Sequence, residues 1–257
     1  MKTLGLAIIT KNEERLIKKC IQSVPFATQI VIVDSHSTDK TVEIAKSCGA
    51  EVITRSWEGY AKQKQYAIEQ LKTDWVLALD GDEYLSKELQ DEIIEIIKSE
   101  TQTKGFYLKR EHVFLKKLLK HGKGVDFQLR LFRRESGHYD DRVIHEKVII
   151  NGPCEKSKMA MIHESSLSLN DEMEKITRDT ELERVYHKGG KIGVSEIIGK
   201  PLKYFLTMFF FKATWKDGLP GFIFLTMTSF KYFLLYSKLY EMNLNSNKRS
   251  SDELSSM

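Results

Sequence analysis

Short apolar runs alternate with amphipathic stretches along the first hundred residues of the chain. Most of the strand-like runs are apolar without interruption, which is typical of strands buried on both faces of a sheet; they are residues 4–9, 30–33, 51–54 and 75–79. Apolar positions with helical spacing follow each run, at residues 13–24, 41–48, 61–71 and 86–98. Strands separated by helices of this length predict βαβ units in a parallel sheet covered on both faces.

The pattern changes near residue 105. Shorter strands separated by polar loops are predicted at residues 105–108, 128–132 and 147–150, which indicates added antiparallel pieces. A charged helix is predicted over residues 170–187, and two apolar helices over 195–242. We therefore expect three parts: an α/β domain at residues 1–187, a helical extension at 188–244 and a flexible tail at 245–257.

Composition excludes several classes of protein. Hydrophobic residues make up 41% of the 257 residues and charged residues 30%, with four prolines and fifteen glycines, so the chain is neither disordered nor collagen-like. Its three cysteines form no CxxC pair, which argues against a disulfide framework or a thiolate zinc cluster. The first residues do not resemble a signal peptide, so we expect a cytoplasmic protein.

Positive charge is concentrated at one end of the chain. Residues 188–257 carry 10 Lys and Arg against 5 Asp and Glu, whereas the rest of the chain is almost balanced within a total net charge of +4. The same region holds the longest apolar runs, a combination that favours an anionic membrane surface over nucleic acid as a partner. The longest run, residues 219–230, is too short to predict a membrane-spanning helix.

Three carboxylates follow directly on the fourth predicted strand, at Asp80, Asp82 and Glu83. Ligands of open α/β sheets bind at the carboxyl ends of the strands. Like charges this close repel unless a cation neutralises them, and hard divalent ions prefer oxygen ligands. A Mg²⁺ or Mn²⁺ ion bridging to a diphosphate would satisfy the group; the alternative is a solvated turn before the next helix.

Polar side chains also close the first two strands, with Thr10, Asn12 and Glu13 after one and Asp34 after the other. They predict a nucleotide pocket in which Asp34 accepts a hydrogen bond from a ribose hydroxyl or a base N–H. Helix capping is the alternative, and it explains Ser37 and Asp39 of the second loop in part. Neither GxGxxG nor GxxxxGK[ST] follows the first strand, so a dinucleotide site and a P-loop are both disfavoured.

Three motifs in order resemble the family 2 glycosyltransferases, which have the GT-A fold: residues 10–14 (TKNEE), 32–41 (IVDSHSTDKT) and 79–83 (LDGDE). Residues 128–134 (QLRLFRR) and 143–146 (VIHE) resemble a narrower branch, the lipopolysaccharide inner-core β-1,4-glucosyltransferases that act on heptose. The resemblance implies an α/β fold of the GT-A type, a Rossmann-like mixed sheet with helices on both faces. The C-terminal helices would be an appendage to this fold.

The resemblance implies a role for individual positions. Asp34 would hold the uracil or ribose, Asp80 the ribose or donor sugar, and Asp82 the metal ion on the diphosphate, with Asp80 assisting. Many members of the family have Asp and Gly where this chain has Ser35 and His36. The remaining positions implied to contact the nucleotide sugar are Thr10, Asn12, Glu13, Lys62 and Lys64. His163 would supply a metal or diphosphate contact, as late histidines do in several GT-A enzymes.

An inverting transfer needs a general base that removes the proton of the acceptor hydroxyl. Glu146 is the first candidate, because the resemblance places the downstream acidic residue of the family near it, and Asp126 is the second. Glu146 could instead be a strand-edge carboxylate paired with Arg142 or Lys147.

Two groups of basic side chains are candidates for binding acidic ligands. Arg130 and Arg133, on either side of Leu131, are expected to share a strand face that binds diphosphate or an acidic acceptor, unless they pair with Asp140 or Asp141. Residues 112–124 form an amphipathic basic segment that would attract a phosphorylated or acidic glycolipid. A solvated helix face is the alternative for that segment.

These expectations describe an inverting glycosyltransferase that moves a hexose, glucose first, from a UDP-sugar to a sugar of a lipopolysaccharide or lipooligosaccharide core. Open alternatives are another cell-surface glycan or a protein as acceptor, a nucleotidyltransferase, and a non-enzymatic membrane glycan-binding module.

We expect a peripheral location on the inner face of the cytoplasmic membrane, held by the C-terminal helices. These helices carry aromatic runs punctuated by lysines at positions 200, 203, 212, 216, 231 and 238. The alternative is that they pack on the core or on a second subunit of a homo-oligomer.

Overall fold

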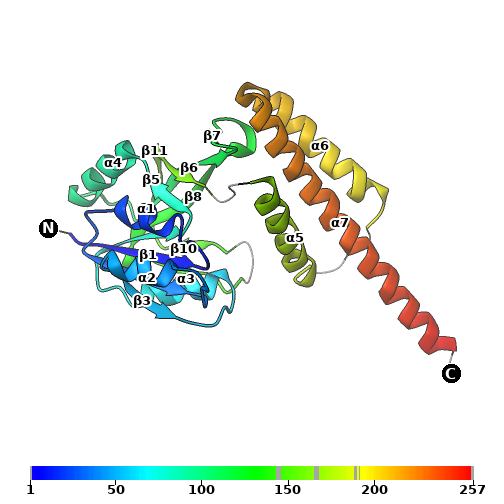
Figure 1. The fold of residues 1–257 in the computed structure, drawn as a ribbon, viewed down its shortest axis with the longest axis horizontal. Coiled ribbons are helices and arrows are strands. Elements are labelled where there is room, and N and C mark those ends of the chain that lie inside the picture. The colour runs from blue at the N-terminus through cyan, green and yellow to red at the C-terminus, as the bar shows by residue number, and fades with distance from the viewer. Residues whose placement is uncertain (1, 143–145, 165–167, 188–189, 191, 256–257) are drawn as a thin grey trace. The chain divides into compact units, whose positions relative to one another are not determined.

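The computed structural model describes residues 2–142, 146–164, 168–187, 190 and 192–255, and only the backbone of residues 245–255. It divides into two units: residues 1–112 with 125–165, here the sheet unit, and residues 113–124 with 166–257, here the helical unit. Figure 1 shows the elements of both.

One mixed sheet runs through the sheet unit in the order β3-β2-β1-β4-β8-β6-β11-β5, with β7 beside β6. The strands β1, β2, β3 and β4 are parallel, β8 is antiparallel to both β4 and β6, and β11 is parallel to β6 and antiparallel to β5. Their bounds are β1 Leu4–Thr10, β2 Gln29–Asp34, β3 Glu51–Thr54, β4 Trp75–Asp80, β5 Glu83–Leu85, β6 Gly105–Phe114, β7 Lys117–Leu118, β8 Val125–Arg133 and β11 Cys154–His163. A two-stranded sheet pairs β9 (Gly137–Tyr139) with β10 (Val148–Ile150).

Helices cover both faces of this sheet, and each face has its own core. Buried apolar side chains of α1 (Ile17–Gln22), α2 (Thr41–Ser47) and α4 (Lys87–Lys98) pack on one face. Those of α3 (Tyr60–Glu69) pack on the other. The predicted α/β architecture with a mixed sheet and helices on both faces is thereby confirmed.

The predicted elements differ from the structure in instructive places. The first helix was expected from residue 13, but α1 begins at Ile17. The backbone N–H groups of residues 12–14 donate to side chains at residues 37–41, which follow β2. Strands β6 and β8 are longer than predicted, and β5 and β11 were not predicted at all.

The helical unit contains α5 (Leu169–Val185), α6 (Lys200–Leu206) and α7 (Gly218–Ser255). The predicted domain boundary at residue 187 is therefore misplaced, since α5 belongs with the later helices: Lys231 of α7 lies 3.3 Å from Asp179 and 2.9 Å from Glu183 of α5. The tail predicted from residue 245 has a helical backbone, because α7 continues to Ser255.

Two further expectations about the helical unit need correction. The alternative of a solvated helix face for residues 112–124 is wrong, because residues 113–118 form a hairpin. Its two turn residues, Leu115 and Lys116, both have positive φ, as a type I′ turn requires. One helical segment, Thr214–Leu244, is long and apolar enough to cross a membrane by length and composition alone, so the expectation that no segment reaches this length is wrong.

Candidate active site

Three of the predicted site residues lie side by side at the carboxyl ends of neighbouring parallel strands. Thr10 at the end of β1 is in register with Asp34 at the end of β2, and Ile9 is in register with Asp80 at the end of β4. This is the edge at which sheets of this kind bind ligands. The structure therefore brings together the two acidic positions that the sequence placed in one pocket.

The loops after β1 and β2 are tied to each other by side-chain hydrogen bonds. Asp34 is buried and accepts from the backbone N–H (2.9 Å) and the hydroxyl of Ser37. Asn12 has a positive φ, which Asn tolerates better than most residues. Its N–H donates to the Ser37 hydroxyl at 2.8 Å, and its Oδ1 accepts from the Thr38 N–H at 2.8 Å. Asp34 and Asn12 are thus held in a rigid loop pair.

Thr10 supplies a buried hydroxyl next to this loop pair. Its Oγ1 has no hydrogen-bond partner among the residues that the structure describes. A Cβ at Gly81 would lie only 2.9 Å from that oxygen, so glycine is the residue that lets the loop after β4 pass close to β1. An orphaned buried hydroxyl of this kind is available to a ligand.

Asp80 lies between two buried cations. Lys64 Nζ is 2.9 Å from its Oδ1, and Arg130 Nη2 is 2.6 Å from its Oδ2. Burial by itself raises the pKa of this carboxyl, but the attraction of Arg130 and Lys64 outweighs burial and holds the pKa far below its usual range. Asp80 is therefore ionised throughout the physiological range of pH.

The same contacts extend in both directions into a chain of alternating charges. Lys64 Nζ donates to Glu146 Oε1 at 2.8 Å, and Arg130 also donates to Glu83, which is completely buried. Arg110 then links Glu83 to Asp126. The order along the chain is Glu146, Lys64, Asp80, Arg130, Glu83, Arg110 and Asp126. With four acids and three bases, this charge chain has a net charge of −1 and the two candidate bases at its ends.

The two ends of the charge chain differ in how they are held. Arg110 binds Asp126 with two parallel hydrogen bonds, Nε to Oδ1 at 2.9 Å and Nη2 to Oδ2 at 2.8 Å. Glu146 has only its Oε1 engaged by a described residue, Lys64, and the preceding residues 143–145 of its motif lie outside the described part of the chain. Within the described part of the chain, the alternative partners Arg142 and Lys147 do not bind Glu146, and Arg142 pairs with Asp140.

Asp82 faces a pair of histidines rather than the charge chain. His163 Nε2 lies 3.0 Å from Asp82 Oδ2, and His163 Nδ1 lies 3.1 Å from His112 Nδ1, so both nitrogens of His163 are engaged. Within the described residues no group of three or more His, Cys, Asp or Glu side chains is arranged as a complete metal site. A carboxylate and an imidazole that face each other still suit an ion whose other ligands are substrate phosphate oxygens and water.

Asp80 does not share this arrangement, although it was predicted to assist in metal binding. Its two oxygens face cations instead, Lys64 Nζ at 2.9 Å and Arg130 Nη2 at 2.6 Å. The residues fit a divalent ion at Asp82 and His163, with Asp80 neutralised separately.

Two basic residues predicted for the site lie elsewhere. Lys62 is exposed and lies 3.4 Å from Glu58, whereas Lys64, two residues further along α3, points inward. Arg133 and Arg130 do not share a strand face, because positions three apart on a strand point to opposite sides. The Arg133 guanidinium lies over the ring of Trp75, and neither arginine forms an ion pair with Asp140 or Asp141 within the described part of the chain.

Sequence reasoning missed Arg110 and the structural role of Glu83. The sequence held a signal for Arg110, because a charged triplet, residues 109–111, interrupts a strand whose flanks are apolar. Buried ion pairs of this kind are a common reason for such an interruption.

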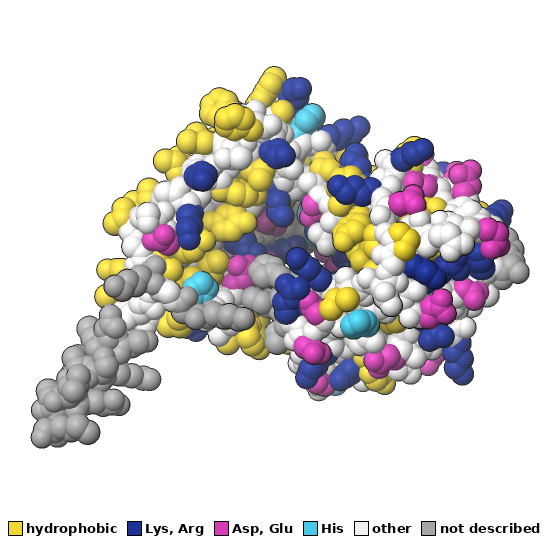
Figure 2. Space-filling model, turned by 180° about the vertical axis from the view of Figure 1, so that it is seen from behind, with side chains coloured by type: hydrophobic (Ala, Val, Ile, Leu, Met, Phe, Trp, Pro, Cys, Tyr) yellow, Lys and Arg dark blue, Asp and Glu magenta, His cyan; other side chains and the backbone are white. Residues whose placement is uncertain are grey.

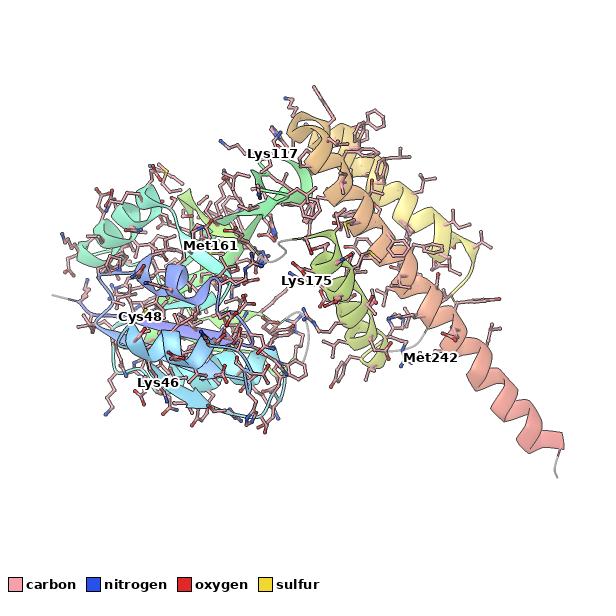
Figure 3. All side chains as sticks on the ribbon, in the orientation of Figure 1. Lys46, Cys48, Lys117, Met161, Lys175 and Met242 are labelled. Carbon is pink, nitrogen blue, oxygen red and sulfur yellow. The ribbon has the colours of Figure 1, made fainter. Side chains whose placement is uncertain are left out.

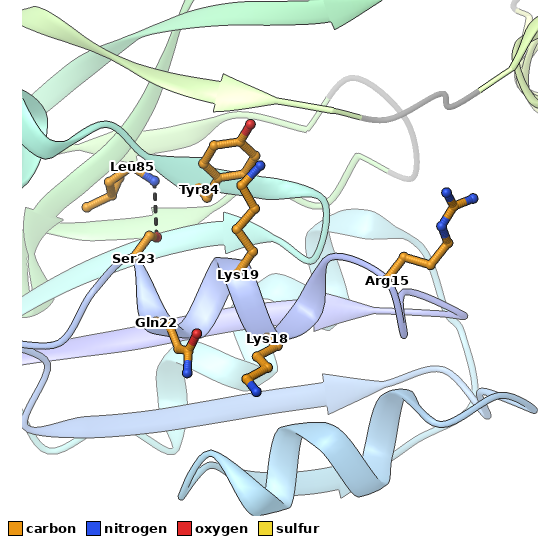
Figure 4. Close-up of a pocket in the computed structure, with 7 residues that line it drawn as sticks. All are labelled: Arg15, Lys18, Lys19, Gln22, Ser23, Tyr84 and Leu85. Atoms are coloured by element: carbon orange, nitrogen blue, oxygen red, sulfur yellow. Dashed lines mark hydrogen bonds between the residues drawn. The ribbon is translucent and has the colours of Figure 1, made fainter. Parts of the chain in front are cut away.

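A second feature that the sequence did not reveal is an open depression on α1 and β5, of about 520 Å³, lined by Arg15, Lys18, Lys19, Gln22, Ser23, Tyr84 and Leu85 (Figure 4). Lys19 lies over the Tyr84 ring, 3.7 Å from its centroid, and binds Glu164 at 3.1 Å. Tyr84 also donates to Glu164. These contacts fasten α1 to the strand edge beside Asp82.

The buried Glu83 predicts a large loss of stability on a small change. In Glu83→Gln the amide NH₂ must face either the two arginines or the backbone N–H of Asp80, all of which are donors. We expect the free energy of unfolding to fall by about 3 kcal/mol, the scale for breaking a buried ion pair. Urea denaturation measures it, with the exposed Glu95→Gln on α4 as the matched control, expected to change by less than about 0.5 kcal/mol. Equal stability of both variants would contradict the structural role of the charge chain.

The chain is similar in sequence to known proteins over most of its length. The model of glycosyl transferase family 2 matches residues 6–153. An uncharacterised glycosyltransferase of Rickettsia bellii (strain RML369-C) is 32% identical over 266 residues, covering 96% of this chain and 89% of that protein. The lipopolysaccharide core biosynthesis glycosyltransferase LpsC of Rhizobium meliloti (strain 1021) is 31% identical over 255 residues, covering 93% and 92%. The crystal structure of S. aureus TarS 1–349 aligns with a TM-score of 0.46 at 14% identity, over 95% of this chain and 92% of that one.

Proposed function

The chain belongs to glycosyltransferase family 2, and on that premise we propose that it transfers a hexose from a UDP-sugar to a sugar of a lipopolysaccharide or lipooligosaccharide core, with inversion at the anomeric carbon. Glucose is the donor sugar that we propose first. The acceptor class is supported by the relative LpsC, which is similar over nearly the whole length of both chains. Membership in this family decides against a nucleotidyltransferase and against a non-enzymatic binding module.

The observation that carries the proposal is the joint placement of Asp34, Asp80, Asp82 and Glu146 around one edge of the sheet. In our proposal the nucleoside is bound by Asp34, by the Thr10 hydroxyl and by the loop of Asn12 and Glu13. Lys64 and Arg130 are cations held beside the donor by Asp80 and contribute positive charge toward the diphosphate. In many enzymes, fixed charges that stabilise the charge developing in the transition state contribute more to the rate than any other effect.

A divalent ion, Mg²⁺ or Mn²⁺, would be held by Asp82 and His163. The chemistry it would supply is neutralisation of the diphosphate as the leaving group departs. His112 fixes the orientation of His163 through the contact between their Nδ1 atoms. Such outer partners set the orientation of a metal-binding imidazole.

Glu146 is proposed as the general base, with Asp126 as the alternative. A base needs a free oxygen within hydrogen-bond reach of the acceptor hydroxyl. The bidentate contact with Arg110 occupies both oxygens of Asp126, whereas Lys64 engages one oxygen of Glu146 and also fixes its position. This asymmetry favours Glu146.

The donor is tested by binding and by product mass. We expect UDP-glucose to raise the melting temperature of the protein more than ATP or GTP does at equal concentration, because a ligand that binds only the folded state stabilises it more the tighter it binds. With core oligosaccharide as acceptor, mass spectrometry should show the addition of one hexose. UDP-galactose, UDP-N-acetylglucosamine and GDP-mannose serve as donor controls. Stabilisation by nucleoside triphosphates alone would contradict the proposal.

A further inference from the structure

One end of the helical unit, which we call the tip, is formed by residues 113–124, which begin with the hairpin, and by residues 207–219, which connect α6 to the start of α7. A small core of Phe114, Leu119 and Phe224 joins the hairpin to α7. The buried Asp217 accepts from the backbone N–H groups of Lys120 (3.1 Å) and His121 (2.9 Å). The tip is therefore a fixed structure made of two distant parts of the chain.

Large apolar side chains project from the tip into solvent. Phe211 is 85% exposed, Leu219 69%, Phe210 62% and Trp215 52%. Two residues of positive φ, Ala213 and Gly218, turn the backbone sharply here. Leu115 at the end of the hairpin is exposed as well. Figure 2 shows hydrophobic side chains gathered over the helices of this unit, with Lys and Arg side chains between them.

The exposed charges of the tip are all positive. Both of its segments together hold six lysines, all exposed, and one acid, the buried Asp217. The lysines are Lys116, Lys117, Lys120, Lys123, Lys212 and Lys216. Figure 3 labels Lys117 on the hairpin. Exposed aromatic groups surrounded by lysines match the boundary between lipid headgroups and acyl chains.

We propose that the tip inserts into the surface of a lipid bilayer that carries anionic headgroups. Each lysine near such a surface contributes about 1 kcal/mol, and the aromatic and leucine side chains leave water for the acyl boundary. A second copy of the chain fits less well, because a two-fold interface would place the same six lysines against each other. A nucleic acid would leave Leu115 and Leu219 in water.

The contacts of α7 argue for insertion of the tip rather than for a helix that crosses the membrane. Lys231, near the middle of the apolar segment Thr214–Leu244, binds Asp179 and Glu183 of α5, and Lys238 lies 3.5 Å from Glu181. A spanning α7 would carry this charged helix toward the centre of the bilayer, at a cost of several kcal/mol for each charge. Lys231 and Lys238 are thus not the membrane-facing lysines that the sequence suggested.

Vesicle flotation of the full chain tests the proposal. We expect the wild type to float with vesicles of 70% phosphatidylcholine and 30% phosphatidylglycerol at low salt, and to stay at the bottom with phosphatidylcholine alone. We expect two double variants to lower the bound fraction at least about tenfold each. One combines Phe211→Ser with Trp215→Ser, and the other combines Lys212→Glu with Lys216→Glu. Val185→Ser with Tyr186→Ser, an exposed apolar pair on the same unit, is the matched control and should float like the wild type.

Four results would overturn the proposal. The first is that the wild type fails to float with anionic vesicles, and the second is that the tip variants float as well as the wild type. The third is that alkaline carbonate fails to release the bound protein from the vesicles. The fourth is that the wild type sediments as a dimer and the tip variants as monomers. The third would indicate a spanning helix and the fourth a subunit interface. Circular dichroism melting checks that each variant is folded. Flotation needs no sugar transfer, so its outcome is independent of the proposed function.

Discussion

Glu146→Gln is expected to lower kcat by about 10²- to 10⁴-fold, the range for loss of a general base. The amide oxygen of Gln can still accept the hydrogen bond that Lys64 donates at 2.8 Å, so the local geometry should survive. UDP-sugar affinity should stay within about twofold of wild type, because the side chain acts on the acceptor hydroxyl in the transition state. Single-turnover kinetics measure the rate of the chemical step, and calorimetric titration with the UDP-sugar in the absence of acceptor measures its affinity.

Asp126→Asn is the control that decides between the two ends of the charge chain. We expect it to reduce stability through the lost pairing with Arg110 and to leave most of the turnover intact. If Asp126→Asn instead abolishes turnover with unchanged UDP binding, and Glu146→Gln does not, the assignment of the base is wrong.

Asp82→Asn should lower kcat/KM at least about 100-fold, on the scale of losing a main electrostatic stabiliser. The substitution keeps the shape of the side chain but removes the charge that would hold a divalent ion with His163. Steady-state rates over a Mn²⁺ and Mg²⁺ titration provide the measurement. The exposed Asp91→Asn on α4 should behave like wild type.

Ion binding gives an independent readout of the same site. Paramagnetic resonance of Mn²⁺ in the presence of UDP should show binding to the wild type and about tenfold weaker binding to Asp82→Asn. Full activity of the wild type in excess EDTA would show that no divalent ion is needed and would end the metal assignment.

The sequence predicted the half of the fold that local patterns determine. The apolar runs that correspond to β1, β2 and β4 are buried on both faces, so their hydrophobic pattern allowed one interpretation. The ends of these parallel strands lie at one edge of the sheet, which placed Asp34 and Asp80 close together. Strand β11 was missed because polar and apolar residues alternate only weakly along it. Its partner strand, β6, also lies far from it in the sequence.

The charge chain could not be predicted from spacing, because its members come from α3, β4, β5, β6, β8 and the segment before β10. Lys62 and Lys64 were equivalent as sequence signals, and only the orientation of α3 separates the exposed lysine from the buried one. Arg130 points inward and Arg133 does not, because side chains three positions apart on a strand point to opposite faces. The sequence interpretation wrongly placed the two arginines on one face.

The anomeric configuration of the product tests the central claim most directly. UDP-glucose is α-linked, so in-line attack by an acceptor hydroxyl deprotonated by Glu146 predicts a β-linked hexose on the core acceptor. Nuclear magnetic resonance of the isolated product reports this configuration through the anomeric proton coupling. The predicted result is a β-linked product from the wild type, formed at least about 100-fold more slowly at the same enzyme concentration by Glu146→Gln and by Asp82→Asn. An α-linked product, or no hexose addition from any UDP-sugar to a core acceptor, would contradict the proposed inverting transfer.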